Sequence, residues 1–209
     1  MKQTSIVSIA TLITLLVASC SSTGTDGGGT TQPGDTDVSA VESTASTAAT
    51  NAAAAISDST YSSLASRMGS TFSSLAGYFD DWDTSTSGWE QSGNVWTYEA
   101  VVNDQVLARW EVTDTGSGWS YELYFDMDDD SVLEKWFSGT VSYDGDDGSY
   151  SYYDASGTVV AEATWTVAGD QVTYTYEVGS YTITMVTATD GSSGTITFND
   201  GSTTQSYTW

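Results

Sequence analysis

The sequence predicts a mainly β protein with an N-terminal helix: an antiparallel meander of about ten strands, strongly curved or closed, with the amphipathic helix on its aromatic face. From residue 89 to 209, apolar and polar residues alternate with a period of two, and turns rich in Gly, Asn and Asp interrupt them. No connection is long enough for a crossover helix, so consecutive strands should pair. Residues 58–79 instead repeat apolar side chains at helical spacing, and this face needs a surface to cover.

The first nineteen residues have the features of a secretory signal peptide. Lys2 precedes an apolar run from Ile6 to Val17, and small residues precede Cys20, the only cysteine. The run is too short to cross a bilayer, which takes about 20 apolar residues in a helix. A lone thiol in a secreted chain risks stray pairing, so we expect the sulfur of Cys20 to be occupied.

Val17-Ala18-Ser19-Cys20 resembles the lipobox of bacterial lipoproteins. The resemblance implies that residues 1–19 are removed and that Cys20 is acylated, so that palmitate or similar chains hold the protein at a membrane. Ser21 resembles the outer-membrane sorting preference of some Gram-negative bacteria. The implied location is the bacterial cell envelope, with a lipid anchor in the outer membrane and the protein on its periplasmic face or at the cell surface.

Composition argues against several classes of function. Without residues 1–19 the chain has three basic residues and 28 acidic ones, a formal charge of −25. Such a surface repels phosphate, so nucleic acid and anionic lipid headgroups are not expected partners. Histidine is absent and the one cysteine is assigned to acylation, which excludes histidine-based triads and His/Cys zinc sites. Carboxylate, hydroxyl or lysine chemistry remains.

Two segments precede the predicted sheet. Residues 20–37 are rich in Gly, Ser, Thr and Asp and contain the only proline, which predicts a flexible tether. Residues 38–83 are predicted to be helical, although the alanine-rich first part has little to bury and predicts only a marginal helix. Asp58 has the side chain of an N-cap residue, and we expect the helix that follows, 58–79, to pack against the sheet rather than against a partner.

A β-meander domain is predicted over residues 89–209. The predicted strands are 94–102, 106–113, 118–126, 131–143, 148–154, 158–167, 171–178, 181–189, 194–199 and 202–209.

Hairpin register is expected to bring opposite charges together on one face of the sheet. A three-residue loop at 103–105 sets Glu99 opposite Arg109. The next two turns set Arg109 opposite Glu122 and Glu122 opposite Lys135. Each pair of this ladder is expected to contribute about 0.2 to 1 kcal/mol.

Apolar partners are expected on the other face. The same turns set Trp110 opposite Tyr121, and a later hairpin sets Trp165 opposite Tyr174. Between these apolar positions lie threonines and carboxylates, so the two faces differ sharply. Glu134 is a misfit, because the predicted register places it on the apolar face.

The predicted layout is similar to that of periplasmic lipoprotein carriers and lipocalin-like barrels. In addition, residues 148–165 (GSYSYYDASGTVVAEATW) resemble the MORN-type hairpin unit: a strand with glycine and aromatic residues, an Asp-x-x-Gly turn at Asp154 and Gly157, and a second strand. The second resemblance implies β-hairpins and no activity.

The large aromatic residues of the sheet could stack on sugars or line a lipid pocket, although ordinary core packing explains such residues as well. Any part of the aromatic face that the helix leaves uncovered is the default ligand site. The candidate ligand-binding residues are Trp96, Trp110, Trp119, Tyr121, Trp165 and Tyr174.

Asp126, Asp128 and Asp130 alternate like the first ligands of a calcium loop. The pattern then departs from an EF-hand, with Ser131 in place of the glycine and Phe137 in place of the final glutamate. These aspartates therefore predict either a weak Ca²⁺ site or a solvated hairpin tip. No other cofactor is expected.

Taken together, these features predict a non-enzymatic, lipid-anchored envelope protein that binds an apolar or glycan ligand, or a protein partner, through a curved sheet. A carboxylate-based glycoside hydrolase is an alternative, with Glu99 and Glu122 as the acids, although charge pairing also explains both residues. A small outer-membrane β-barrel is a third interpretation, because Tyr207-Thr208-Trp209 resembles the terminal aromatic signal of such barrels.

Overall fold

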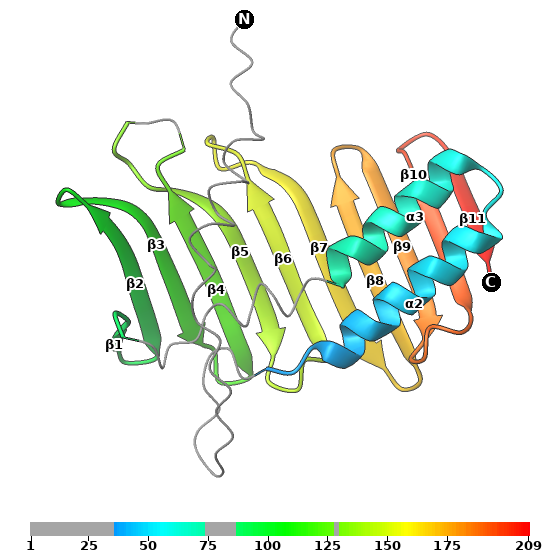
Figure 1. Ribbon diagram of the computed structural model, residues 1–209, viewed down its shortest axis with the longest axis horizontal. Coiled ribbons are helices and arrows are strands. Elements are labelled where there is room, and N and C mark those ends of the chain that lie inside the picture. Colours follow the sequence, from blue (N-terminus) through cyan, green and yellow to red (C-terminus); the bar gives the residue numbers. More distant parts are fainter. Residues whose placement is uncertain (1–35, 74–86, 128–129) are drawn as a thin grey trace, which may run out of the picture. The chain divides into compact units, whose positions relative to one another are not determined.

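The computed structural model describes residues 36–73, 87–127 and 130–209 (Figure 1). Cys20, nearly all of the tether, Asp128 and the last part of the predicted 58–79 helix lie outside these residues. Eleven antiparallel strands form one sheet in sequence order, from β1 at one edge to β11 at the other. The predicted meander is confirmed, and within the described residues its sheet is open. Two helices cover one face of this sheet over β7 to β11 (Figure 1).

The helices are α2 (Ser39–Ala55) and α3 (Ser59–Phe72), and the strands are β1 (Glu90–Ser92), β2 (Val95–Val102), β3 (Gln105–Asp114), β4 (Gly118–Phe125), β5 (Glu134–Ser142), β6 (Asp147–Tyr153), β7 (Val159–Ala168), β8 (Gln171–Val178), β9 (Tyr181–Ala188), β10 (Gly194–Asn199) and β11 (Thr204–Thr208). Ten of the strands lie close to their predicted positions. The sequence did not predict β1, whose three residues are all exposed and show no alternation.

Helix α2 packs closely against the sheet, so the expectation that this segment has little to bury was wrong. Ala45, Ala48 and Ala52 recur on one face and are fully buried. Because alanine is short, the backbone of the helix can lie close to the strands that it covers. The Asn51 side chain donates a hydrogen bond of 3.0 Å to the carbonyl of Gly191 in the β9–β10 turn.

Helix α3 begins as predicted, at Asp58. The carboxylate of this residue accepts hydrogen bonds from the backbone N–H groups of Thr60, at 2.8 Å, and Tyr61, at 3.4 Å. Farther along, α3 touches α2 at Gly69, where an added Cβ atom would lie only 2.4 Å from the Cβ of Ala49. The two helices can approach this closely because residue 69 has no side chain.

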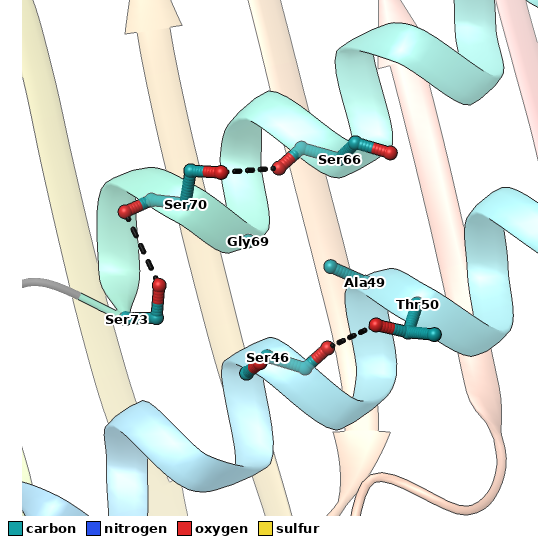
Figure 2. Close-up of a pocket in the computed structure, with 7 residues that line it drawn as sticks. All are labelled: Ser46, Ala49, Thr50, Ser66, Gly69, Ser70 and Ser73. Atoms are coloured by element: carbon teal, nitrogen blue, oxygen red, sulfur yellow. Dashed lines mark hydrogen bonds between the residues drawn. The ribbon is translucent and has the colours of Figure 1, made fainter.

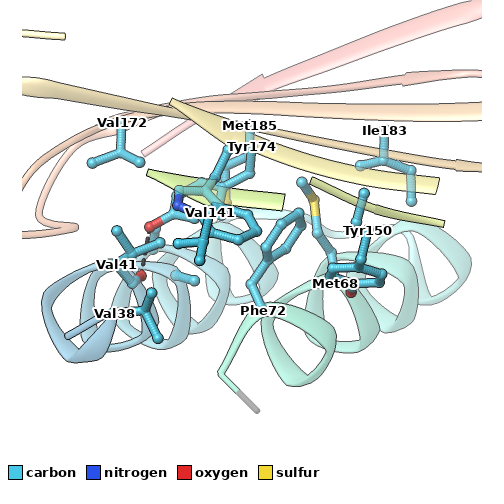
Figure 3. Close-up of a cluster of buried hydrophobic side chains, with 14 of the residues drawn as sticks. Val38, Val41, Met68, Phe72, Val141, Tyr150, Val172, Tyr174, Ile183 and Met185 are labelled. Atoms are coloured by element: carbon cyan, nitrogen blue, oxygen red, sulfur yellow. Dashed lines mark hydrogen bonds between the residues drawn. The ribbon is translucent and has the colours of Figure 1, made fainter. Parts of the chain in front are cut away.

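The main core lies between the helices and the sheet (Figure 3). Phe72 is fully buried, and its ring centre lies 4.9 Å from that of Tyr174. The hydroxyl of Tyr174 donates a hydrogen bond of 2.6 Å to the carbonyl of Val41 in α2. Burial raises the pKa of this hydroxyl, because an ionised oxygen would lose its hydration there. An apolar contact from α3 and a hydrogen bond to α2 therefore meet on one tyrosine.

The predicted register is correct in the C-terminal hairpins, where Trp165 pairs with Tyr174. It is wrong at the first turn, which has two residues rather than three: Asn103 and Asp104 both have positive φ, at 52° and 63°. A β-bulge then makes Leu107 an extra residue in β3, which restores the predicted pairing of Glu99 with Arg109.

In the next hairpin the register differs from the predicted one by two residues. Trp110 pairs with Leu123 and Arg109 with Tyr124, so the predicted pairing of Arg109 with Glu122 was wrong. The turn is centred one residue later than predicted: the N–H of Thr115 donates to the carbonyl of Gly118 at 3.0 Å, and the N–H of Gly116 donates to the carboxylate of Asp114 at 2.8 Å. A shift of two keeps every side chain on its face, so the apolar pattern cannot reveal it.

The face of the sheet opposite to the helices is polar. One row across this face receives a threonine or serine from each strand from β3 to β11, and none of these nine side chains is buried. Neighbours in the row pair directly in the ladder, and two pairs share hydrogen bonds of 2.9 Å between hydroxyl oxygens. The residues are Thr113, Ser120, Thr140, Ser149, Thr164, Thr175, Thr184, Thr197 and Ser206.

Candidate functional site

A continuous chain of ring contacts crosses the first half of the apolar face. We call these six residues the aromatic row, and each of them is partly exposed. Successive ring centres lie 5.1 to 6.1 Å apart, and four of the five contacts are edge-to-face. The residues are Trp89, Tyr98, Trp110, Phe125, Trp136 and Tyr152. Helices α2 and α3 lie over β7 to β11 and do not extend over β2 to β5, where most of the row lies (Figure 1).

A β-bulge completes the aromatic row. Leu123 pairs with Phe137 but Tyr124 pairs with Lys135, so Trp136 is an extra residue in β5. Strict alternation would place Trp136 and Phe137 on opposite faces, whereas a bulge turns both toward one face. Trp136 consequently contacts Phe125 on one side, at 5.8 Å, and Tyr152 on the other, at 5.1 Å.

The six predicted ligand-binding residues all lie on the apolar face, but they divide into two groups. Trp96 and Trp110 are partly exposed, whereas Trp119, Tyr121, Trp165 and Tyr174 are at most 1 % exposed. The indole N–H of Trp165 donates to the carbonyl of Gly145 at 2.9 Å. These four buried residues are part of the core.

Sequence reasoning missed most of the aromatic row. Among the six predicted residues only Trp110 belongs to it. The available signal was the adjacent pair Trp136-Phe137, which breaks the period of two and so marks a bulge. Because the bulge was not predicted, the contacts of Trp136 with Phe125 and with Tyr152 were not predicted either.

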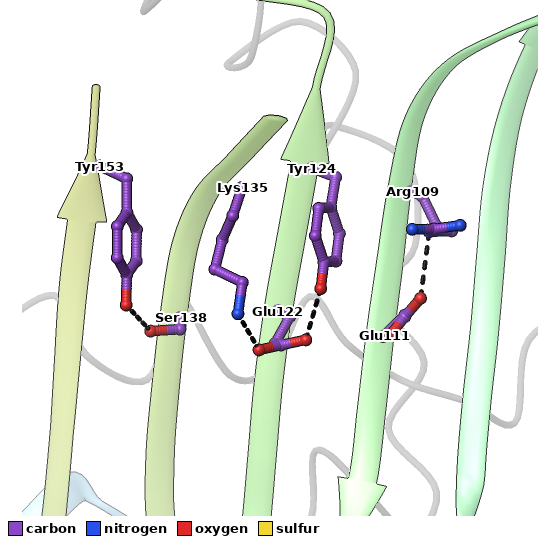
Figure 4. Close-up of polar contacts among 7 residues, drawn as sticks. All are labelled: Arg109, Glu111, Glu122, Tyr124, Lys135, Ser138 and Tyr153. Atoms are coloured by element: carbon purple, nitrogen blue, oxygen red, sulfur yellow. Dashed lines mark hydrogen bonds and ion pairs between the residues drawn. The ribbon is translucent and has the colours of Figure 1, made fainter. Parts of the chain in front are cut away.

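The polar face holds a small network around Glu122 (Figure 4). Its carboxylate accepts a hydrogen bond of 2.6 Å from the hydroxyl of Tyr124 and forms an ion pair with Lys135. Partial burial raises the pKa of this carboxyl, but the hydrogen bonds and the positive charges of Lys135 and Arg109 outweigh that effect and lower the pKa below its usual value. Glu122 is therefore held ionised, unlike a general acid, whose pKa must be raised.

The predicted charge ladder is only partly present. Lys135 does reach Glu122, although the two residues are not direct partners in the sheet. Arg109 instead pairs with Glu111 on its own strand, at 3.0 Å, and its guanidinium lies 4.9 Å from the ring centre of Tyr124. Because of the two-residue shift, Glu122 is displaced along the strands from the row that contains Glu99, and the two glutamates do not face each other as a pair.

The carboxylates of the β4–β5 loop cap backbone N–H groups. Asp126 accepts from Asp130 and Ser131, at 3.0 and 2.9 Å. Glu134, the predicted misfit on the apolar face, accepts from Met127 at 2.8 Å at the end of the sheet. In the described part of the chain, which omits Asp128, no group of three or more acidic or cysteine side chains is placed to hold a metal ion.

A shallow groove of about 230 Å³ separates the outer faces of α2 and α3 (Figure 2). Its lining consists of Ser46, Ala49, Thr50, Ser66, Gly69, Ser70 and Ser73. Several of these hydroxyls donate to carbonyls of their own helix; that of Thr50 lies 2.9 Å from the Ser46 carbonyl. The groove follows from the small residues that bring the helices together, and we do not assign a ligand to it.

Among the described residues, no helix is long and apolar enough to cross a membrane. No protein-family model matches the chain, and neither the curated proteins nor the solved structures include a significant match.

Proposed function

We propose that the protein is a lipid-anchored, non-enzymatic binding protein of the bacterial cell envelope, and that its aromatic row stacks on a neutral glycan. The observation that carries this proposal is the row itself: partly exposed rings in continuous contact, outside the area that α2 and α3 cover. A pyranose ring presents C–H groups on its faces, and an exposed indole or phenol ring offers a complementary flat apolar surface.

The negative charge of the chain also restricts the classes of glycan that it could bind. The chain carries 28 acidic residues and few basic ones, so polyanionic glycans would be repelled. A neutral polysaccharide carries no such penalty. Anchoring of the chain rests on Cys20 and its lipobox resemblance, and a tether of about seventeen residues would let the sheet reach polymers beyond the membrane surface.

Binding can be tested by calorimetry with neutral hexasaccharides of glucose and of N-acetylglucosamine. Trp110→Ala and Trp136→Ala should each weaken binding about tenfold, because each removes one stacking platform. Tyr181→Ala, which also removes an exposed aromatic side chain but lies outside the row, is the matched control and should bind normally. Equal affinity of all four proteins, or no binding by the parent, would contradict the proposal.

The same samples test the enzymatic alternative. Release of new reducing ends from the hexasaccharides, abolished by Glu99→Gln or Glu122→Gln, would show a glycoside hydrolase instead. We expect none. The anchor is tested separately: Cys20→Ser should accumulate as an unprocessed precursor that takes up no labelled palmitate, and equal labelling of mutant and parent would remove the anchoring proposal.

A further inference from the structure

The exposed apolar side chains of the described sheet gather at one end of its strands. Nine large apolar side chains are exposed in the described residues, and eight of them lie at or beside the hairpins that join β2 to β3, β4 to β5, β6 to β7 and β8 to β9. These four hairpins emerge at the same end of the meander, at the top of Figure 1. We call the eight residues the upper edge: Val101, Val102, Leu107, Val132, Val159, Val160, Val178 and Tyr181.

The opposite end of the sheet is different. Its hairpins contain Asp, Gly, Ser and Thr, and Tyr143 is their single exposed large apolar residue among those described. The hydroxyl of Tyr143 is bound to the carboxylate of Asp114. Chance placement of exposed side chains would not favour one end so strongly, and soluble chains rarely cluster exposed apolar groups unless something covers them.

Backbone geometry supports a built surface. Three of these four hairpins contain a β-bulge in their second strand, and the extra residue is apolar each time: Leu107 and Val160 belong to the upper edge, and Trp136 belongs to the aromatic row. Leu107 and Val160 are 41 % and 45 % exposed. Bulges re-aim side chains and bend the strand, so they turn these residues away from the regular alternation.

Charge identifies the kind of occupant. The turns of these four hairpins contain Asp104, Asp126, Asp130 and Asp154, the β10–β11 turn at the same end contains Asp200, and none of the five turns contains Lys or Arg. Hydrogen bonds from the Ser156 hydroxyl and from backbone N–H groups lower the pKa of the Asp154 carboxyl, so it stays ionised. Like charge repels both a second copy of this chain and an anionic lipid surface.

We propose that the upper edge docks a protein segment in which Lys or Arg residues flank apolar side chains. The valines, Leu107 and Tyr181 would pack against the apolar side chains of such a partner, and the turn carboxylates would lie opposite its cations. This site is separate from the aromatic row, and it does not depend on glycan binding.

The test uses the full-length chain and a synthetic peptide of seven Lys-Leu repeats as the probe. The variant carries Val102→Thr, Leu107→Thr, Val160→Thr and Tyr181→Thr; threonine suits a strand, and all four positions are well exposed, so the fold should persist. Tyr143→Thr, at the opposite end, is the control. We expect the fourfold variant to bind at least about tenfold more weakly than the parent, and the control to bind like the parent.

Further peptides separate the contribution of charge attraction to the binding affinity from that of apolar contact. A Lys-Ser peptide tests charge alone and should bind weakly and equally to parent and variant, whereas a Glu-Leu peptide should not bind. Equal binding of Lys-Leu by parent and variant would overturn the proposal, as would tight binding of Glu-Leu. Vesicles of phosphatidylcholine and phosphatidylglycerol that bind the parent but not the variant would assign the edge to a bilayer instead. If the variant unfolds, the pair Leu107→Thr with Val160→Thr gives the same comparison.

Retention of hexasaccharide binding by the fourfold variant, and retention of Lys-Leu binding by Trp110→Ala, would show that the two surfaces act independently. Failure of one proposal would therefore be distinguishable from failure of the other.

Discussion

Gly69→Ala tests the close packing of α2 on α3, because helix propensity and packing predict opposite signs for it. In an exposed helix interior, replacing glycine by alanine stabilises by about 0.8 to 1.0 kcal/mol. Here the added Cβ atom would lie 2.4 Å from the Cβ of Ala49, more than 1 Å inside an ordinary carbon–carbon contact of about 3.5 to 4.0 Å.

The clash should win. The opposing atom is a Cβ fixed to the α2 backbone, so it cannot rotate away, and the helices must separate. Overpacking of this kind costs about 1 to 3 kcal/mol. After the gain in propensity is subtracted, we expect Gly69→Ala to lower the free energy of unfolding by up to about 2 kcal/mol.

The assay is urea unfolding of a chain beginning at Ser21, followed by circular dichroism and tryptophan fluorescence. Ser66→Ala is the control, because Ser66 is exposed on the same helix and its hydroxyl donates to the carbonyl of Ser62; its effect should stay within about 0.5 kcal/mol. The double variant Gly69→Ala with Ala49→Gly removes the opposing methyl group and should show favourable coupling. Stabilisation by Gly69→Ala would refute the close approach of the helices.

Three further predictions concern the core, the polar face and calcium. Phe72→Ala should lower the free energy of unfolding by about 3 to 5 kcal/mol in the same urea assay, and a change below about 0.5 kcal/mol would mean that the side chain is exposed. Glu122→Gln should cost about 0.2 to 1 kcal/mol at neutral pH, because its ion pair with Lys135 is partly exposed. The folded-state pKa of Glu122 is lowered from its ordinary 4.5, so this stabilisation is complete above about pH 5 and is lost as pH falls through the folded-state pKa. The free energies of unfolding of the parent and the variant should therefore converge in acid. A difference that does not change with pH would contradict the ion pair of Glu122 with Lys135. For calcium, we compare the parent with the double variant Asp128→Asn and Asp130→Asn. CaCl₂ and NaCl at matched ionic strength should shift the melting temperature of both proteins equally, because screening alone relieves the repulsion among the acidic side chains. A rise in melting temperature that is specific to calcium and that only the parent shows would demonstrate a calcium site.

Local pattern alone was enough to predict the meander, its two unlike faces and the N-cap at Asp58. Alternation reports which residues share a face, and turn residues report where strands end, so ten strands were placed closely. The pairing of Trp165 with Tyr174 also followed, because a short turn there leaves one register that buries both.

The candidate site depended on register shifts and β-bulges, which the alternation of apolar and polar residues does not reveal. A register shift of two residues leaves every face unchanged, so the sequence could not distinguish Glu122 from Tyr124 as the partner of Arg109. Bulges add a residue on one strand only, and the one at Trp136 creates the central contacts of the aromatic row.

What the sequence determined by itself is the chemistry available: no histidine, one cysteine, a strong negative charge, and a sheet with an aromatic face and a hydroxyl face. Only the tertiary structure decided which aromatic residues are core and which remain accessible. Trp165 and Trp110 are the same residue type at equivalent alternating positions, yet one is 1 % exposed and the other is partly open. The physical reason is that burial of a sheet residue depends on everything that packs over and beside it, which alternation does not report. Trp165 lies on β7, in the part of the sheet that the helices cover, whereas Trp119 on β4 is 1 % exposed although the helices do not extend there.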